Sequence, residues 1–255
     1  TMKSLSSALA ALALLPLSAC SQEAAFDQHA EIVATYPHDA RAFTQGLFIH
    51  EGVLYESTGQ VGESSLRRVD LETGRVEAQV DIPRPIFGEG SAQVGDEIFV
   101  LSWQAERGFI YNAATLEQVD GFNYPGEGWG LTYDGRHLIL SDGTPEIRFI
   151  NPESMEWDHS IEVTYNGRPM NNLNELEWIN GEIWANIWMT RSIARINPRS
   201  GEVVGIIALD TLIPSEVLGR RDAVANGIAY NAQTGQIYVT GKLWPALYEI
   251  RIVDD

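Results

Sequence analysis

The chain has 255 residues and a formal net charge of −18, with 35 acidic against 17 basic side chains. Nucleic acids and anionic lipid surfaces bind clusters of lysine and arginine, and no such cluster occurs here, so neither is expected as a partner. A chain of this length, with 44% hydrophobic residues, can bury a large core.

The N-terminal segment is typical of a secretory signal. Lys3 precedes an apolar run over residues 8–17, and this run is too short to span a membrane. It leads to the sequence LSAC at 17–20, which resembles a bacterial lipobox, and Cys20 is the only cysteine of the chain. We therefore expect Cys20 to carry lipid and to form no disulfide.

These features predict three segments. Residues 1–19 form a lipoprotein signal peptide, in which Thr1 is interpreted as a cloning residue; residues 20–28 are the lipidated cysteine and a tether; residues 29–255 form the catalytic domain. The expected location is the periplasm, with the protein held at the membrane only through Cys20. Ser21 after the cysteine favours the outer membrane, by resemblance to bacterial sorting signals.

A short pattern recurs five times along the rest of the chain. Each copy has a polar or aromatic residue, usually then a glycine, and an apolar residue, shortly before a β-rich run. The copies begin at intervals of 44, 40, 45 and 52 residues, at Gln45, Glu89, Trp129, Asn174 and Asn226. Such a period is typical of a β-propeller, because one four-stranded sheet cannot bury both of its faces alone. We predict an all-β, five-bladed β-propeller, and a monomer.

The second half of each repeat reads as an outer hairpin with turn residues at its tip. The fifth copy lacks one strand, because the chain ends soon after residues 246–253. The run EIVATY at 31–36 supplies a strand before the first repeat. We expect this N-terminal strand to complete the last blade and close the ring, which leaves no free sheet edge there.

Equivalent positions of a propeller converge on its central axis, so the five first residues of the repeats form a predicted ring. Two loops, over 164–172 and 211–225, precede ring strands and are expected at the rim of this ring, although they also fit variable surface connections. Phe43 and Phe87, two residues before the first two ring positions, are also expected near the ring. About 14 residues after each ring position, at the far end of the same strand or in the next turn, stand Gly59, Trp103, Gly143, Trp188 and Lys242. The sequence thus predicts a small, mostly apolar pocket with a few polar groups.

Six ordered segments resemble one known family. They are AFTQGL (42–47), FGEGSA (87–92), GEGWGLTYDG (126–135), LNELEWINGEIWANIW (173–188), ANGIAY (225–230) and TGKLW (240–244). Over residues 30–252 the chain is similar to the plant and bacterial type of glutaminyl-peptide cyclotransferase. The resemblance implies a five-bladed propeller that converts the N-terminal glutamine of peptides and proteins to pyroglutamate and releases ammonia.

The resemblance also implies roles for individual residues. Glu89 is the expected general acid and base, and Lys242 is the second expected catalytic residue. The expected substrate-binding residues are Phe43, Gln45, Phe87, Trp103, Trp129, Asn174, Trp188 and Asn226.

The reaction explains why these residue types are needed. One carboxyl can take a proton from the attacking amine and return it to the departing nitrogen. We expect surrounding aromatic residues to raise the pKa of Glu89 and Lys242, if it is close, to lower it; the sequence does not decide which effect is larger. Indole N–H groups or Lys242 are candidates to stabilise the oxyanion, and the amides of Gln45 and Asn174 can tell glutamine from glutamate.

Two other interpretations fit the same pattern. A ring with Glu89, Asn174 and Asn226 offers oxygen ligands for calcium, as in a calcium-dependent propeller hydrolase of the lactonase type. Lys242 and Trp129 argue against it, since neither supplies a ligand oxygen. We expect no cofactor for catalysis and no catalytic metal, because the five histidines lack spacings such as HxH or HExxH; a structural calcium in the channel stays open. The second alternative is a non-catalytic propeller lipoprotein that acts as a scaffold.

Overall fold

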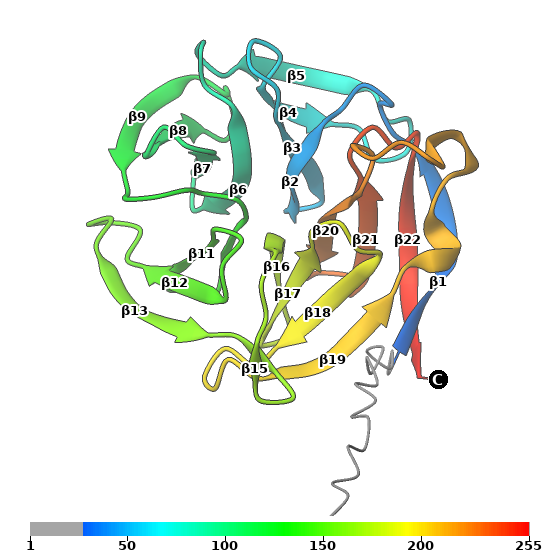
Figure 1. Ribbon diagram of the computed structural model, residues 1–255. Helices are drawn as coiled ribbons and strands as arrows, with labels where there is room; N and C mark the ends of the chain where they lie inside the picture. Colours follow the sequence, from blue (N-terminus) through cyan, green and yellow to red (C-terminus); the bar gives the residue numbers. More distant parts are fainter. Residues whose placement is uncertain (1–27, 255) are drawn as a thin grey trace, which may run out of the picture.

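Strands make up most of the described chain, which comprises residues 28–254 of the computed structural model. Figure 1 shows these strands gathered in small sheets around a central axis, as in a β-propeller. The predicted signal peptide, Cys20 and the tether up to residue 27 lie outside the described residues. Within residues 28–254, no helix is long and apolar enough to cross a bilayer.

Three antiparallel sheets of four strands follow one another along the chain. The first contains β2 (Thr44–His50), β3 (Val53–Thr58), β4 (Ser65–Val69) and β5 (Val76–Asp81). The second contains β6 (Gly88–Val94), β7 (Glu97–Ser102), β8 (Arg107–Asn112) and β9 (Gln118–Asn123). The third contains β10 (Leu131–Tyr133), β11 (Leu138–Ser141), β12 (Glu146–Ile150) and β13 (Trp157–Glu162).

The remaining large sheet has eight strands, in the order β16-β17-β18-β19-β1-β22-β21-β20. Its bounds are β16 (Leu173–Ile179), β17 (Glu182–Ile187), β18 (Ser192–Ile196), β19 (Val203–Ala208), β20 (Ala225–Asn231), β21 (Gln236–Gly241), β22 (Ala246–Asp254) and β1 (Gln28–Pro37). A small hairpin, β14 (Thr164–Tyr165) with β15 (Arg168–Pro169), and two 3₁₀ turns, η1 (Asp210–Leu212) and η2 (Ser215–Val217), lie in the connections.

The N-terminal strand closes the ring. β1 pairs antiparallel with β22 along its whole length, so it completes the last group of four strands, as predicted. It begins at Gln28, before the predicted start at residue 31, and two of its residues also pair in parallel with β19. The predicted all-β propeller architecture is confirmed. Five separate blades are not observed, because this parallel pairing joins the fourth and fifth groups into one sheet.

Burial differs between inner and outer strands because inner strands lie between two neighbouring sheets. In β3 five of six residues are buried, whereas in β5 half-buried and exposed residues alternate. Separate apolar clusters fill the spaces between sheets; Leu66 of the first sheet and Ile98 and Phe109 of the second belong to one of them. This packing holds the inner strands, and therefore the ring residues, in fixed positions.

Glycines after the ring residues permit a close approach of neighbouring inner strands. A Cβ atom on Gly46 would lie 2.6 Å from the backbone nitrogen of Ser91, and one on Gly130 would lie 2.0 Å from the carbonyl oxygen of Asn174. Side chains do not fit at such distances. These glycines therefore have a structural role in the packing of neighbouring inner strands.

The fourth repeat has Glu175 where the others have glycine. Its buried carboxylate accepts hydrogen bonds from the backbone N–H groups of Leu47 (3.2 Å) and Ile228 (2.9 Å), which belong to β2 and β20. Burial raises the pKa of Glu175 well above its usual value. This side chain thus joins three inner strands beneath the ring.

The residues about 14 positions after the ring lie after the second strand of each group, rather than at the far end of the first strand. Since the first two strands are antiparallel, the end of the second returns to the rim where the first begins. The same backbone hydrogen bond fixes this rim in several groups: Gly59 N–H to Phe43 (2.8 Å), Trp103 to Phe87 (3.0 Å), Trp188 to Asn172 (2.8 Å) and Lys242 to Val224 (2.9 Å).

Candidate active site

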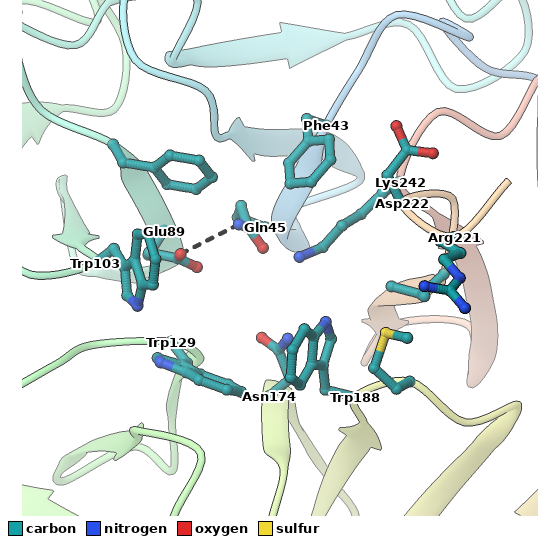
Figure 2. Close-up of a pocket in the computed structure, with 13 residues that line it drawn as sticks. Phe43, Gln45, Glu89, Trp103, Trp129, Asn174, Trp188, Arg221, Asp222 and Lys242 are labelled. Atoms are coloured by element: carbon teal, nitrogen blue, oxygen red, sulfur yellow. Dashed lines mark hydrogen bonds between the residues drawn. The ribbon is translucent and has the colours of Figure 1, made fainter.

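A cavity of about 340 Å³ opens at this rim of the propeller (Figure 2). Nine of the ten residues predicted for the site line it: Phe43, Gln45, Phe87, Glu89, Trp103, Trp129, Asn174, Trp188 and Lys242. They lie on the strands of the four large sheets or in the segments that directly precede or follow these strands, so the site is complete only when the ring is closed. The prediction that these positions converge is confirmed.

Glu89 lies on β6 and is buried, with 5% of its surface exposed. The side-chain amide of Gln45 donates a hydrogen bond of 3.2 Å to its Oε1 atom (Figure 2). Burial raises the pKa of Glu89 well above 4.5; Lys242 lowers it by a smaller effect, and the charge of Glu127 raises it further. The opposing effects that the sequence left open are thus decided by burial.

Asn226 is the exception among the predicted substrate-binding residues. It is completely buried and does not line the cavity. Its Nδ2 atom donates to the carbonyl oxygen of Thr44 (3.0 Å) and to Oε1 of Gln45 (3.3 Å). Asn226 therefore holds the side chain of Gln45 through a hydrogen bond and is not itself a lining residue of the cavity.

Lys242 follows β21 and is 5% exposed. Its Nζ atom lies 4.8 Å from the centroid of the Phe43 ring, and Figure 2 shows the chain of Lys242 extending into the cavity. Burial lowers the pKa of Lys242 to about 8, although the carboxylate of Glu89 acts in the opposite direction. The ammonium is thus weakly solvated, and a substrate oxygen that develops negative charge would attract it.

Aromatic rings form the walls of the cavity. Phe87 contacts Phe43 and Trp103 at centroid distances of 6.1 and 5.7 Å, and Trp129 contacts Trp188 at 5.5 Å, all edge to face. Edge-to-face pairs fix the orientation of the rings. The cavity therefore presents flat apolar surfaces in fixed positions.

Glu127 is a residue of the site that the sequence analysis missed. Its Oε2 atom accepts hydrogen bonds from the indole nitrogens of Trp103 (2.8 Å) and Trp129 (2.9 Å), and its Oε1 atom accepts from the amide of Gln104 (2.9 Å). Burial alone would raise its pKa, but these three donors outweigh burial and lower it. In this structure the N–H groups of these two tryptophans are donated to Glu127, so a role for them in stabilising an oxyanion stays a prediction.

Asn174 lies on β16 and is 3% exposed. It lines the cavity, and its buried Oδ1 atom has no hydrogen-bond partner among the described residues. A buried carbonyl oxygen without a partner costs free energy of about 1–3 kcal/mol. The cavity therefore offers an acceptor for an N–H group of a ligand.

Four further lining residues were not predicted individually: Met189, Arg221, Asp222 and Val224. The last three belong to the loop over 211–225, so this loop does lie at the rim of the cavity, as expected. The loop over 164–172 contributes no lining residue. The loop over 211–225 was placed at the rim because it precedes a ring strand. That position does not indicate which of its side chains line the cavity.

Comparisons with known proteins agree with this geometry. The model of a family described as "Glutamine cyclotransferase" matches residues 5–252. The chain is 43% identical over 226 residues to the glutaminyl-peptide cyclotransferase of Arabidopsis thaliana. The aligned region covers 87% of this chain and 71% of the relative. The crystal structure of Myxococcus xanthus glutaminyl cyclase superimposes with a TM-score of 0.85 at 36% identity, over 90% of this chain and 99% of that chain.

A more distant solved structure, the hydrazine synthase of Kuenenia stuttgartiensis, has a TM-score of 0.50 at 16% identity, over 86% of this chain and 64% of that chain. It shares the fold alone. The family model and the match to the Arabidopsis relative both extend over most of the chain. The range matched by the family model includes every residue that lines the cavity. The chain belongs to the glutamine cyclotransferase family.

Proposed function

We propose that this protein is a glutaminyl-peptide cyclotransferase, which converts the N-terminal glutamine of peptides or proteins to pyroglutamate and releases ammonia. The observation that carries the proposal is that one aromatic cavity is lined both by Glu89, a buried carboxyl of raised pKa, and by Asn174, whose amide oxygen has no hydrogen-bond partner among the described residues. The names of the Arabidopsis and Myxococcus relatives describe the same activity.

Positioning is the first task of such an enzyme. The α-amine and the γ-carboxamide belong to one residue, so the nitrogen must be brought against Cδ before a five-membered ring can form. The walls built from Phe87, Trp103, Trp129 and Trp188 limit the rotamers of a glutamine side chain. Confinement to a near-attack geometry removes much of the entropic part of the barrier.

Proton transfer is the second task. As the amine nitrogen bonds to Cδ, Glu89 accepts one of its protons, and the carbonyl becomes a tetrahedral oxyanion. Glu89 then returns this proton to the carboxamide nitrogen, the bond from Cδ to that nitrogen breaks, and ammonia leaves. A raised pKa suits a carboxyl that both accepts and donates, and such transfer contributes about 10²–10⁴-fold to the rate.

Recognition of the carboxamide rests on Asn174 and Lys242. The Oδ1 atom of Asn174 can accept an N–H of the substrate carboxamide, which a glutamate side chain does not offer. The ammonium of Lys242 is a buried cationic donor that faces the same cavity and can stabilise the oxyanion.

Glu127 completes the mechanism as a positioning residue. By binding both indole N–H groups it fixes Trp103 and Trp129 on one side of the cavity. Its negative charge also raises the pKa of Glu89. We infer that it maintains both the shape of the cavity and the proton affinity of the general base.

The direct test is ammonia release from a dipeptide that begins with glutamine, with mass spectrometry to identify the pyroglutamyl product. This mechanism needs no Lewis acid, so turnover should persist after dialysis against EDTA. If EDTA abolished turnover without unfolding the protein, and calcium restored it, the calcium-dependent hydrolase would be the better interpretation. A folded protein with no turnover of glutamine peptides would support the scaffold.

The location follows from a part of the chain outside the described residues. The LSAC sequence before a serine supports a periplasmic lipoprotein held at the outer membrane through the lipid of Cys20. Substrates would then be peptides or proteins of the periplasm whose N-terminal residue is glutamine.

A further inference from the structure

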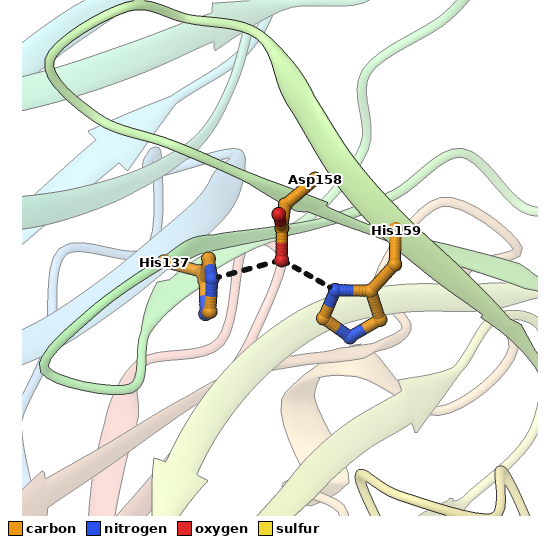
Figure 3. A group of neighbouring side chains, drawn as sticks. All are labelled: His137, Asp158 and His159. Carbon is orange, nitrogen blue, oxygen red and sulfur yellow. Dashed lines mark hydrogen bonds and ion pairs between the residues drawn. The ribbon is translucent and has the colours of Figure 1, made fainter.

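Three metal-binding side chains meet on the third sheet. His137 lies in the turn before β11, and Asp158 and His159 lie on β13, the last strand of that sheet (Figure 3). One ligand atom of each lies within 4.8 Å of the others. None of the three lines the active-site cavity, and the proposed mechanism does not use them.

The distances between the ligand atoms fit a divalent transition metal. The Oδ2 atom of Asp158 lies 3.4 Å from Nε2 of His137 and 3.0 Å from Nδ1 of His159. A tetrahedral zinc ion with bonds of about 2.0–2.1 Å holds its ligand atoms roughly 3.3 Å apart. Two of the three pairs therefore already have the required separation.

The histidine rings are held in orientation by their neighbours. Oδ2 of Asp134 lies 3.3 Å from Nδ1 of His137, and the other oxygen of Asp134 accepts the backbone N–H groups of Arg136 (2.7 Å) and His137 (2.6 Å). The ring of His159 stacks on Phe149, at 4.2 Å and an interplanar angle of 13°. A carboxylate on the second nitrogen of a ligand histidine is typical of protein metal sites.

The contact between Asp134 and His137 also indicates which nitrogen of His137 carries a free lone pair. When Nδ1–H of His137 donates to Asp134, its Nε2 atom presents a lone pair to the carboxylate of Asp158. Two electron-rich atoms at 3.4 Å repel each other unless a cation lies between them. Either a second proton or a metal ion can supply that charge.

We propose that His137, Asp158 and His159 form a surface site for a divalent transition metal of the zinc class. Two imidazoles and one carboxylate favour zinc, cobalt, nickel or copper over calcium or magnesium, which prefer oxygen ligands. Asp158 and His159 are exposed, so a fourth position is open to solvent. The ion would join β13 to the turn before β11 and thereby stabilise the third sheet.

The test is zinc binding to the full chain after treatment with EDTA and removal of the chelator. We expect titration calorimetry with zinc chloride to give one site, and cobalt to give the visible absorption of a tetrahedral ion. Zinc should also raise the melting temperature.

Variants test whether zinc binds at this site and not at another histidine or in the active-site cavity. His159→Ala and Asp158→Asn should each lower zinc affinity at least tenfold, whereas His50→Ala, a histidine on β2, and Glu89→Gln should bind zinc like the wild type. Circular dichroism verifies folding, and Asp158→Asn is the milder of the two ligand changes. The proposal is overturned if the wild type binds no zinc, if the ligand variants bind it equally well, or if Glu89→Gln removes the binding.

Discussion

Replacement of Glu89 by glutamine tests the proposed proton transfer most directly. Glutamine has nearly the same volume, and its carbonyl oxygen can still accept the hydrogen bond that Gln45 donates over 3.2 Å. The aromatic residues that position the substrate make no hydrogen bond to Glu89, so the substitution should leave substrate binding, and therefore KM, nearly unchanged. Loss of the carboxyl should lower kcat by about 10²- to 10⁴-fold.

The raised pKa of Glu89 adds a prediction about stability. Its ordinary pKa is 4.5 and its folded-state pKa lies well above that value because of burial, so the unfolded chain loses this proton at a lower pH than the folded chain. Below pH 4.5 the wild-type carboxyl costs nothing. As the pH rises from 4.5 towards the folded pKa, it destabilises the fold by about 1.4 kcal/mol for each pH unit. Glu89→Gln lacks this penalty and should gain stability relative to the wild type as the pH rises above 4.5.

The assays are steady-state ammonia release from a glutamine dipeptide and urea unfolding followed by circular dichroism at several pH values. Glu63→Gln is a matched control, because Glu63 is exposed and lies outside the cavity. The reasoning would be refuted by a folded Glu89→Gln protein with near wild-type kcat. A stability difference that did not change with pH would show that burial does not raise the pKa of Glu89.

Two further predictions rest on contacts of Glu127 and Gly130, and a third rests on the sequence around Cys20. Glu127→Gln should raise KM about tenfold and move the acidic limb of the kcat/KM profile to lower pH, because the charge that raises the pKa of Glu89 is lost; an unchanged profile would contradict this. Gly130→Ala places a Cβ atom 2.0 Å from the carbonyl oxygen of Asn174 and should cost about 1–3 kcal/mol in thermal unfolding, whereas an unchanged melting temperature would exclude close strand approach. Cys20→Ala should release the protein from the membrane fraction of cells, and unchanged fractionation would exclude a lipid anchor.

Much of the architecture could be predicted because each repeat encodes it locally. Strand-forming runs and turn residues specify four strands per unit, and glycines such as Gly46 mark where inner strands approach each other. The missing strand at the C-terminus correctly predicted the pairing of β1 with β22. The parallel pairing of β1 with β19 had no such signal, because it depends on how two finished blades meet at the circumference.

The site was predictable to the extent that ring positions carry its side chains. Nine of the ten predicted residues line one cavity, since equivalent positions of the repeats converge on the axis. The contacts of Glu127 and Asn226 were not predictable. Each contact is a hydrogen bond between side chains whose orientation the repeat pattern does not specify. Glu127 accepts from the indoles of Trp103 and Trp129, and Asn226 donates to Gln45.

The sequence alone therefore determined which residues stand at the ring, because strand periodicity and repeat spacing are properties of neighbours along the chain. Only the tertiary structure decided their chemistry. The pKa of Glu89 depends on the exclusion of water by surrounding blades. The cluster of His137, Asp158 and His159 depends on the pairing of β11 with β12 and of β12 with β13, which brings these residues to one end of the third sheet. The exclusion of solvent around Glu89 requires the closed ring, whereas the His137, Asp158 and His159 cluster requires only the folded third sheet.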